Sequence, residues 1–126
     1  MRFPSVAIDG WQLLNGEEHH QWAPGTFPIP TRPEREGLRA GDFAKLMFEI
    51  AVGDRVVVER MWVLVVARNE GSFIGVLDND PTEIAENDEL WSGTELPFAA
   101  ANVIAIMERS ESSLAMAKLP PRRSWR

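Results

Sequence analysis

The sequence predicts a mainly β or α+β domain. The expected fold is a small, strongly curved antiparallel sheet or an SH3-like open barrel of about five strands, with little helix. Residues 42–50 alternate between an apolar set and a mixed set of side chains, a pattern typical of a strand with one buried face. Residues 55–67 are rich in β-branched side chains and become apolar on both faces, which favours a central strand or one that curls within a barrel. Short glycine turns bound both segments.

The second half of the chain predicts shorter elements. Three strands are expected, at residues 72–77, 94–98 and 103–107. Gly75 inside the first of them indicates a bulge or a close backbone approach. One helical turn is predicted at 81–86, where Asp80 can cap a turn that begins with Pro81, and a short helix at 112–119.

One globular domain is predicted over residues 1–118, with its β core at 41–108. Residues 1–40 hold several Pro, Asn-Gly and Asp-Gly signals, so we expect one short strand near 5–14 followed by an irregular wrap. Residues 119–126 follow two prolines and are basic, which predicts a flexible tail.

Composition and charge restrict the classes of function. The chain has 126 residues and no cysteine, so disulfides and Cys-ligated zinc are excluded. The formal net charge is −6 and is uneven, since residues 118–126 carry +4 and the rest therefore −10. An acidic body repels phosphates, which argues against nucleic acid and suits a basic protein partner. No apolar run approaches a membrane span and no leader peptide is recognisable, so we expect a cytoplasmic protein that does not bind membranes.

Few residues are placed for catalysis or metal binding. His19 and His20 are adjacent, which suits a shared ion poorly, and a solvated turn is favoured. Asp78 and Asp80 resemble the start of a calcium loop, but the glycine of such a loop is missing. Glu59 is a conceivable general base without a nucleophile to serve. We therefore expect a non-enzymatic protein without a cofactor.

Acidic residues and tryptophans are the better candidates for a binding surface. Trp91 follows an acidic segment and suits a partly exposed anchor for a partner, whereas Trp62 lies within an apolar run and is expected in the core. The candidate partner contacts are Glu83, Glu86, Asp88, Glu89 and Trp91.

Two sequence motifs, Glu59-Arg-Met-Trp-Val63 and Gly75-Val-Leu-Asp-Asn-Asp-Pro81, resemble a family of small bacterial domains of unknown function. Some members of that family are described as immunity proteins of polymorphic-toxin systems. The similarity spans about residues 24–108 and implies a small β-rich cytoplasmic domain with no established catalytic residues. The motif positions of unknown role are Glu59, Arg60, Trp62, Asp78, Asn79 and Pro81.

Three functional hypotheses follow. The leading one is a protein-binding module, an immunity-type inhibitor of a basic partner. The second is a small-ligand or metal-binding domain that uses the acidic turn between Asp78 and Asp80. The third is a structural domain that self-associates as a homodimer through an exposed strand.

Overall fold

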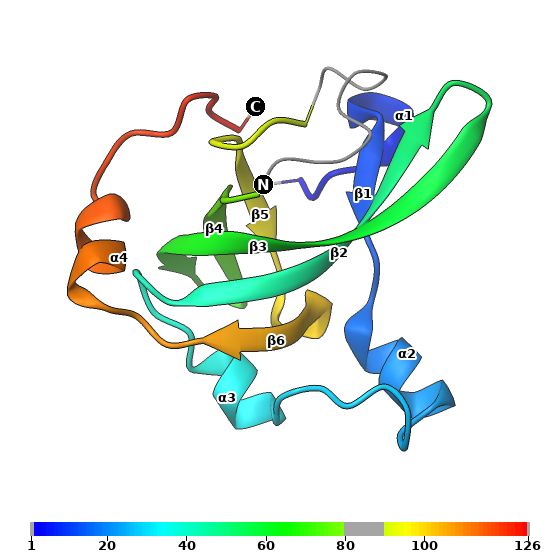
Figure 1. Cartoon of the computed structure of the whole chain (residues 1–126), viewed down its shortest axis with the longest axis horizontal. Helices are drawn as coiled ribbons and strands as arrows, with labels where there is room; N and C mark the ends of the chain where they lie inside the picture. Colours follow the sequence, from blue (N-terminus) through cyan, green and yellow to red (C-terminus); the bar gives the residue numbers. More distant parts are fainter. Residues whose placement is uncertain (1, 80–89, 126) are drawn as a thin grey trace.

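The computed structural model describes residues 2–79 and 90–125 and has a mainly β architecture (Figure 1). Six antiparallel strands form one sheet that curls into a half-barrel, and only a few short helices accompany it. The predicted fold class is confirmed. Within the described ranges, no helix combines the length and the apolar composition that crossing a bilayer requires.

The hairpin of β2 (Phe43–Val52) and β3 (Arg55–Asn69) is the longest part of the sheet. On β2 the even-numbered side chains face the core, as the alternation predicts, and all five are buried: Ala44, Leu46, Phe48, Ile50 and Val52. On β3 both faces are buried only around residues 63–65: Val63 and Val65 lie in the core, and Leu64 faces the C-terminal segment on the other side. β1 pairs with β2 as far as Ile50, and only the tip of the hairpin beyond that point projects from the sheet (Figure 1).

The remaining strands complete a meander that returns to β2. β4 (Ser72–Leu77) pairs with β3, and β5 (Glu95–Phe98) pairs with β4. A single turn of 3₁₀ helix, η2 (Ala100–Asn102), leads into β6 (Val103–Met107), which pairs with the first half of β2. This order, with the last strand of the meander beside the first, is the connectivity expected for the predicted open barrel.

The additional strand β1 (Trp11–Leu13) pairs with the second half of β2, so β1 and β6 share one edge of that strand. Trp11 is fully buried against Phe48, with ring centroids 5.7 Å apart. On β4, a Cβ on Gly75 would lie 3.0 Å from the Phe98 ring and 3.2 Å from the Leu64 carbonyl oxygen. The predicted close backbone approach at Gly75 is therefore confirmed.

The N-terminal forty residues differ from the irregular wrap that their prolines predict. They contain three short helices, α1 (Val6–Asp9), α2 (Gly16–Trp22) and α3 (Arg32–Glu36). Asn15, expected in a hairpin turn with Gly16, instead caps α2 by accepting a hydrogen bond from the Glu18 backbone N–H at 3.1 Å. Asparagine before glycine suits both roles, and tertiary contacts select the cap.

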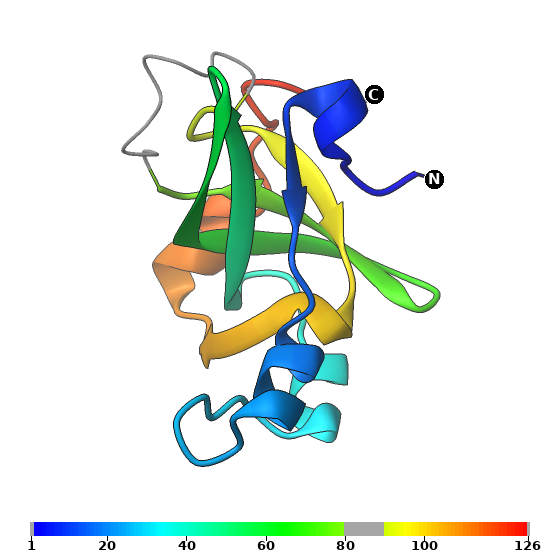
Figure 2. The same cartoon turned by 90° about the vertical axis from the view of Figure 1, so that its right-hand side faces the viewer.

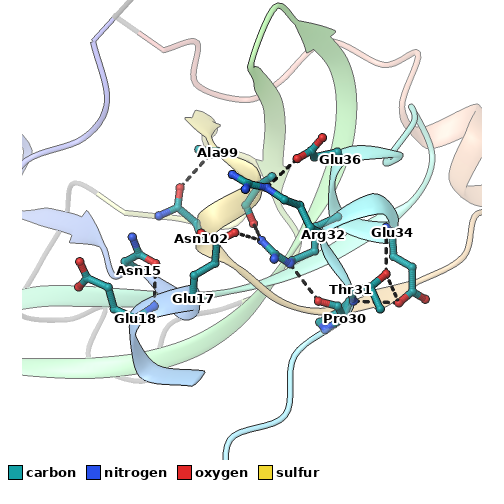
Figure 3. A network of polar contacts seen from close by, with 12 residues as sticks. Asn15, Glu17, Glu18, Pro30, Thr31, Arg32, Glu34, Glu36, Ala99 and Asn102 are labelled. Carbon is teal, nitrogen blue, oxygen red and sulfur yellow. Dashed lines mark hydrogen bonds and ion pairs between the residues drawn. The ribbon is translucent and has the colours of Figure 1, made fainter. Parts of the chain in front are cut away.

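A buried arginine joins α2, α3 and η2 at one end of the half-barrel, opposite the chain termini (Figure 2). Arg35 is 4 % exposed. Its Nη1 donates to the Glu17 carboxylate at 2.6 Å and to the Ala100 carbonyl at 2.8 Å, and its Nε donates to the Pro30 carbonyl at 3.0 Å (Figure 3). All three partners are acceptors, so the guanidinium satisfies groups from three separate segments.

The C-terminal segment packs against the body, where the sequence predicted a flexible tail. It begins with α4 (Glu111–Met116), close to the predicted helix, and then crosses the end of β5. The Glu95 backbone N–H donates to the Arg123 carbonyl at 2.8 Å, and the Arg122 N–H donates to the Gly93 carbonyl at 3.0 Å. Trp125 packs on Trp11, with ring centroids 6.0 Å apart. We call residues 117–125 the C-terminal strap.

Replacing Arg35 by methionine should lower the free energy of unfolding by about 3 kcal/mol, because the substitution leaves the Glu17 carboxylate and two carbonyls without their donor. The matched control is Arg32→Met, which removes an exposed pair with Glu36 and should change stability by no more than about 0.5 kcal/mol. Urea denaturation measures both. Equal losses for the two variants would contradict the structural role given to Arg35.

Candidate functional site

Three of the motif positions meet where β4 ends. The Asn79 side-chain oxygen accepts a hydrogen bond from the Trp62 backbone N–H at 2.8 Å, and the Asp78 N–H donates to the Trp62 carbonyl at 3.0 Å. Asn79 thus takes the place of a further β4 residue and ends the β3–β4 ladder. Part of this motif is therefore structural, as expected for a strand terminus.

The Asp78 side chain stands at the rim of a cavity of about 290 Å³, which we call the Asp78 cavity. Leu64 and Val76, paired neighbours on β3 and β4, form part of its wall. The C-terminal strap and the end of α4 form the opposite wall, to the left in Figure 1. The complete lining is Leu64, Val76, Leu77, Asp78, Ser92, Gly93, Met116, Leu119, Pro120, Pro121 and Arg122.

The cavity combines apolar walls with one acid and one base. Asp78 is an exposed residue, and the partial desolvation of its carboxylate at the rim raises its pKa above the ordinary value of 3.8. Within residues 2–79 and 90–125, the Asp78 carboxylate has neither a hydrogen-bond donor nor an ion-pair partner. Arg122 lies on the same rim without forming an ion pair with it. The arrangement can bind a cationic group that is carried on an aliphatic stem. The cation would lie against Asp78 and the stem against the apolar wall.

Gly93 determines how closely the C-terminal strap crosses the site. Its φ of +93° is a conformation that other residues rarely adopt, and a Cβ there would lie 2.8 Å from the Arg122 Cγ and Cδ atoms. The strap could not lie in its present place over a larger residue. The close approach fixes the position of Arg122 and hence one side of the cavity rim.

Trp91 lies beside the cavity and is 44 % exposed, which confirms the predicted partial exposure. Its backbone N–H donates to the Thr94 hydroxyl at 3.2 Å. A second hollow of about 330 Å³ joins Trp91 and Ser92 to Arg122 and Arg123. Asp78 and Trp91, predicted from separate signals, therefore flank the same surface.

Other predicted residues lie elsewhere. Trp62 was expected in the core but is half-buried on the outer face, where the Lys45 Nζ lies 5.6 Å from its ring centroid. Arg60 is exposed, with its guanidinium 5.3 Å from the Phe27 ring, and neighbouring Glu59 points to the opposite face. The described residues do not include those for which a helical turn at 81–86 and further site roles were predicted, namely Asp80, Pro81, Glu83, Glu86, Asp88 and Glu89.

The two histidines both lie on α2 and bind backbone carbonyls. The His19 Nδ1 is 3.1 Å from the Asn15 carbonyl oxygen, and the His20 Nδ1 is 2.8 Å from that of Phe27. In the part of the chain that the structure describes, no group of three or more His, Asp or Glu side chains is arranged to hold a metal ion. The histidines therefore order the chain around α2.

Sequence reasoning missed the contribution of the chain end. Met116, Leu119, Pro120 and Arg122 line the Asp78 cavity, yet the segment reads as basic and proline-rich. The available signal was Trp125, a large apolar side chain that packs against the core, whereas Leu119 stays 65 % exposed. Disordered segments contain few large aromatic side chains.

Comparison with known proteins gives no assignment. No protein-family model, no curated protein and no solved structure matches this chain.

Asp78→Asn should raise the free energy of unfolding at neutral pH, because the native-state pKa of Asp78 lies above its ordinary value. A raised native pKa means that the ionised carboxylate weakens the native state, and this penalty disappears as pH falls below the ordinary aspartate range. The gain from Asp78→Asn should shrink in the same direction. Urea denaturation across that pH range measures it, with Glu70→Gln at the opposite end of β4 as the control. A neutral-pH gain no larger than that of the control would contradict the desolvation of Asp78.

Proposed function

We propose that this chain is a non-enzymatic protein-binding module, an immunity-type inhibitor whose Asp78 cavity receives a basic side chain of a partner protein. The observation that carries the proposal is the position of the partly desolvated Asp78 carboxylate at the rim of a largely apolar cavity. Lysine and arginine side chains have an apolar stem, which can contact the apolar wall, and a terminal cation, which can pair with the Asp78 carboxylate. Carboxylates retained at a cost in stability are typical of functional sites.

The surface around the cavity offers further contacts, which favours a whole protein as the partner over an isolated small cation. Trp91 is exposed beside it, and tryptophan is among the residues that contribute most to protein interfaces. The chain has a net charge of −6, which steers a basic partner towards it. In this proposal Glu83, Glu86, Asp88 and Glu89, which precede Trp91 in the sequence, extend the contact. The protein acts in the cytoplasm, as the family resemblance implies.

If the proposal holds, the Asp78→Asn variant should fail to capture the partner protein that the wild type binds. The full-length tagged chain is used to purify partners from its host at low and moderate salt, and the retained proteins are identified by mass spectrometry. Wild type and Glu70→Gln should retain the same near-stoichiometric basic protein, whereas Asp78→Asn should lose it at moderate salt, because its charge pair is missing.

The outcomes of the capture experiment separate two parts of the proposal. A partner that Asp78→Asn retains as well as wild type does would exclude the cavity as the contact. Replacing the four acidic residues at 83–89 by their amides then tests that segment by itself. Capture of no basic protein by wild type would count against a protein partner altogether.

A second candidate function is the binding of a small zwitterionic ligand. The observation that favours it is the presence of Asp78 and Arg122, which carry opposite charges, on one rim of the same cavity. The volume of about 290 Å³ lies near the lower end of small-molecule sites. An amino-acid-like ligand offers an ammonium group to Asp78 and a carboxylate to Arg122.

Thermal melts with free amino acids, other metabolites and divalent cations test the second candidate. A true ligand at 100 times its dissociation constant should add about 2.7 kcal/mol to the stability of the wild type. The same ligand should shift Asp78→Asn and Arg122→Gln much less, because each variant lacks one charged contact. A shift shared equally by both variants would place the ligand elsewhere, and no shift at high concentration would contradict this function.

A further inference from the structure

Among the residues that the structure describes, none pairs with one edge of β3 over residues 56–60. β4 covers that edge only from residue 63 onwards, and the Asn79 side chain takes the Trp62 backbone N–H. Within the described ranges of the chain, no strand pairs with the edge before Trp62. An uncovered edge offers backbone donors and acceptors to another strand.

The direction of the backbone groups follows from the register. The N–H and C=O of Trp62 point away from β2, towards Asn79 and Asp78. Successive residues of a strand direct these groups to alternate edges, and the β2–β3 register is regular from residue 55 to 64. Val56, Val58 and Arg60 therefore present their N–H and C=O groups along the open edge.

Two exposed valines flank the centre of this edge, and Val57 between them packs partly against the core. Val56 is 54 % exposed and Val58 is 52 % exposed, and both stand on the outer face of the hairpin near its tip (Figure 1). Native edges are usually protected by charges. The charges here flank the valines on both sides: the sequence from residue 54 to 60 reads Asp-Arg-Val-Val-Val-Glu-Arg.

This segment is complementary to itself when it runs antiparallel. With Val57 on a two-fold axis, Val56 lies opposite Val58 of a second copy, and Arg55 lies opposite Glu59 of that copy. The same register brings Asp54 level with Arg60. Every charge in the segment then faces an opposite charge, and cross-strand pairs of this kind stabilise a sheet.

We propose that the chain forms a two-fold symmetric homodimer by antiparallel pairing of the β3 edge, centred on Val57. The partner that fits this edge is a second copy of the chain. The charges of residues 54–60 are complementary to the same seven residues in antiparallel orientation, as a two-fold symmetric interface requires. The pair joins two half-barrels through a continuous sheet. This inference goes beyond the proposed function, since it concerns a different surface from the Asp78 cavity.

Charge exchange tests the pairing on the full-length chain, with mass measured by sedimentation equilibrium over a concentration series. The wild type should dimerise. Glu59→Arg and Arg55→Glu each place two like-charge pairs in the dimer and should each weaken it about tenfold. Arg55 and Glu59 each have an interaction within their own chain that the single substitutions also remove, so an equimolar mixture of the two variants is the decisive sample.

In that mixture every Arg faces a Glu, and a heterodimer should form with an affinity close to that of the wild type. The double variant R55E/E59R should dimerise with itself for the same reason. Circular dichroism confirms that each variant is folded. A wild type that stays monomeric at every concentration, or a mixture that does not recover dimerisation, would overturn the proposal.

Single cysteines test the register, because the chain has none of its own. Two residues on the axis of an antiparallel pair have Cα atoms about 4.5 Å apart when they are not hydrogen-bonded to each other, which is within disulfide reach. Val57→Cys should therefore form a disulfide-linked dimer on mild oxidation. The matched control, Val56→Cys, should not, since its own counterpart lies two residues away. Faster cross-linking of Val58→Cys would show a different register and overturn the one proposed here.

Discussion

The pairing of β2 on both of its edges is the interaction on which the rest of the structure depends. One edge pairs over its whole length with residues 55–64 of β3, and the other edge is divided between β6 and β1. The meander can therefore close back on its first strand, and the N-terminal segment is held to the same strand. The buried side chains of β2, such as Phe48, form the centre of the hydrophobic core, because the curled sheet packs other strands against them.

Segments outside the sheet are held by charged groups that are only partly accessible to water. Arg35 ties the helices of the N-terminal region to η2. At the opposite end, the Arg2 guanidinium forms two hydrogen bonds with the buried Asp9 carboxylate, at 2.7 and 2.8 Å, and stacks 4.5 Å from the Trp125 ring centroid. Trp125 in turn packs on Trp11. The two chain ends are thus fastened to each other and to the core, which keeps the C-terminal strap over the outer face of the sheet.

The candidate site follows from that position of the strap. The outer face of a half-barrel is normally open to solvent, but here the strap and α4 face Leu64 and Val76 across a cavity. Asp78 lies at its rim because Asn79 ends the β4 ladder there and fixes the backbone of its neighbour. The carboxylate consequently loses part of its hydration without gaining a partner in the described chain, and this is the physical basis for assigning it a ligand.

The sequence alone determined the strands, because their side-chain alternation records which face of each is buried, as at Leu46 and Phe48. It also singled out Asp78 and Trp91. It did not determine the helix capped by Asn15, since Asn-Gly suits a hairpin turn and a helix start equally well. Only the tertiary structure decided that residues 117–125 form a strap and complete the cavity. Their partners, such as Gly93, are distant in sequence, and local pattern carries no record of contacts between distant segments.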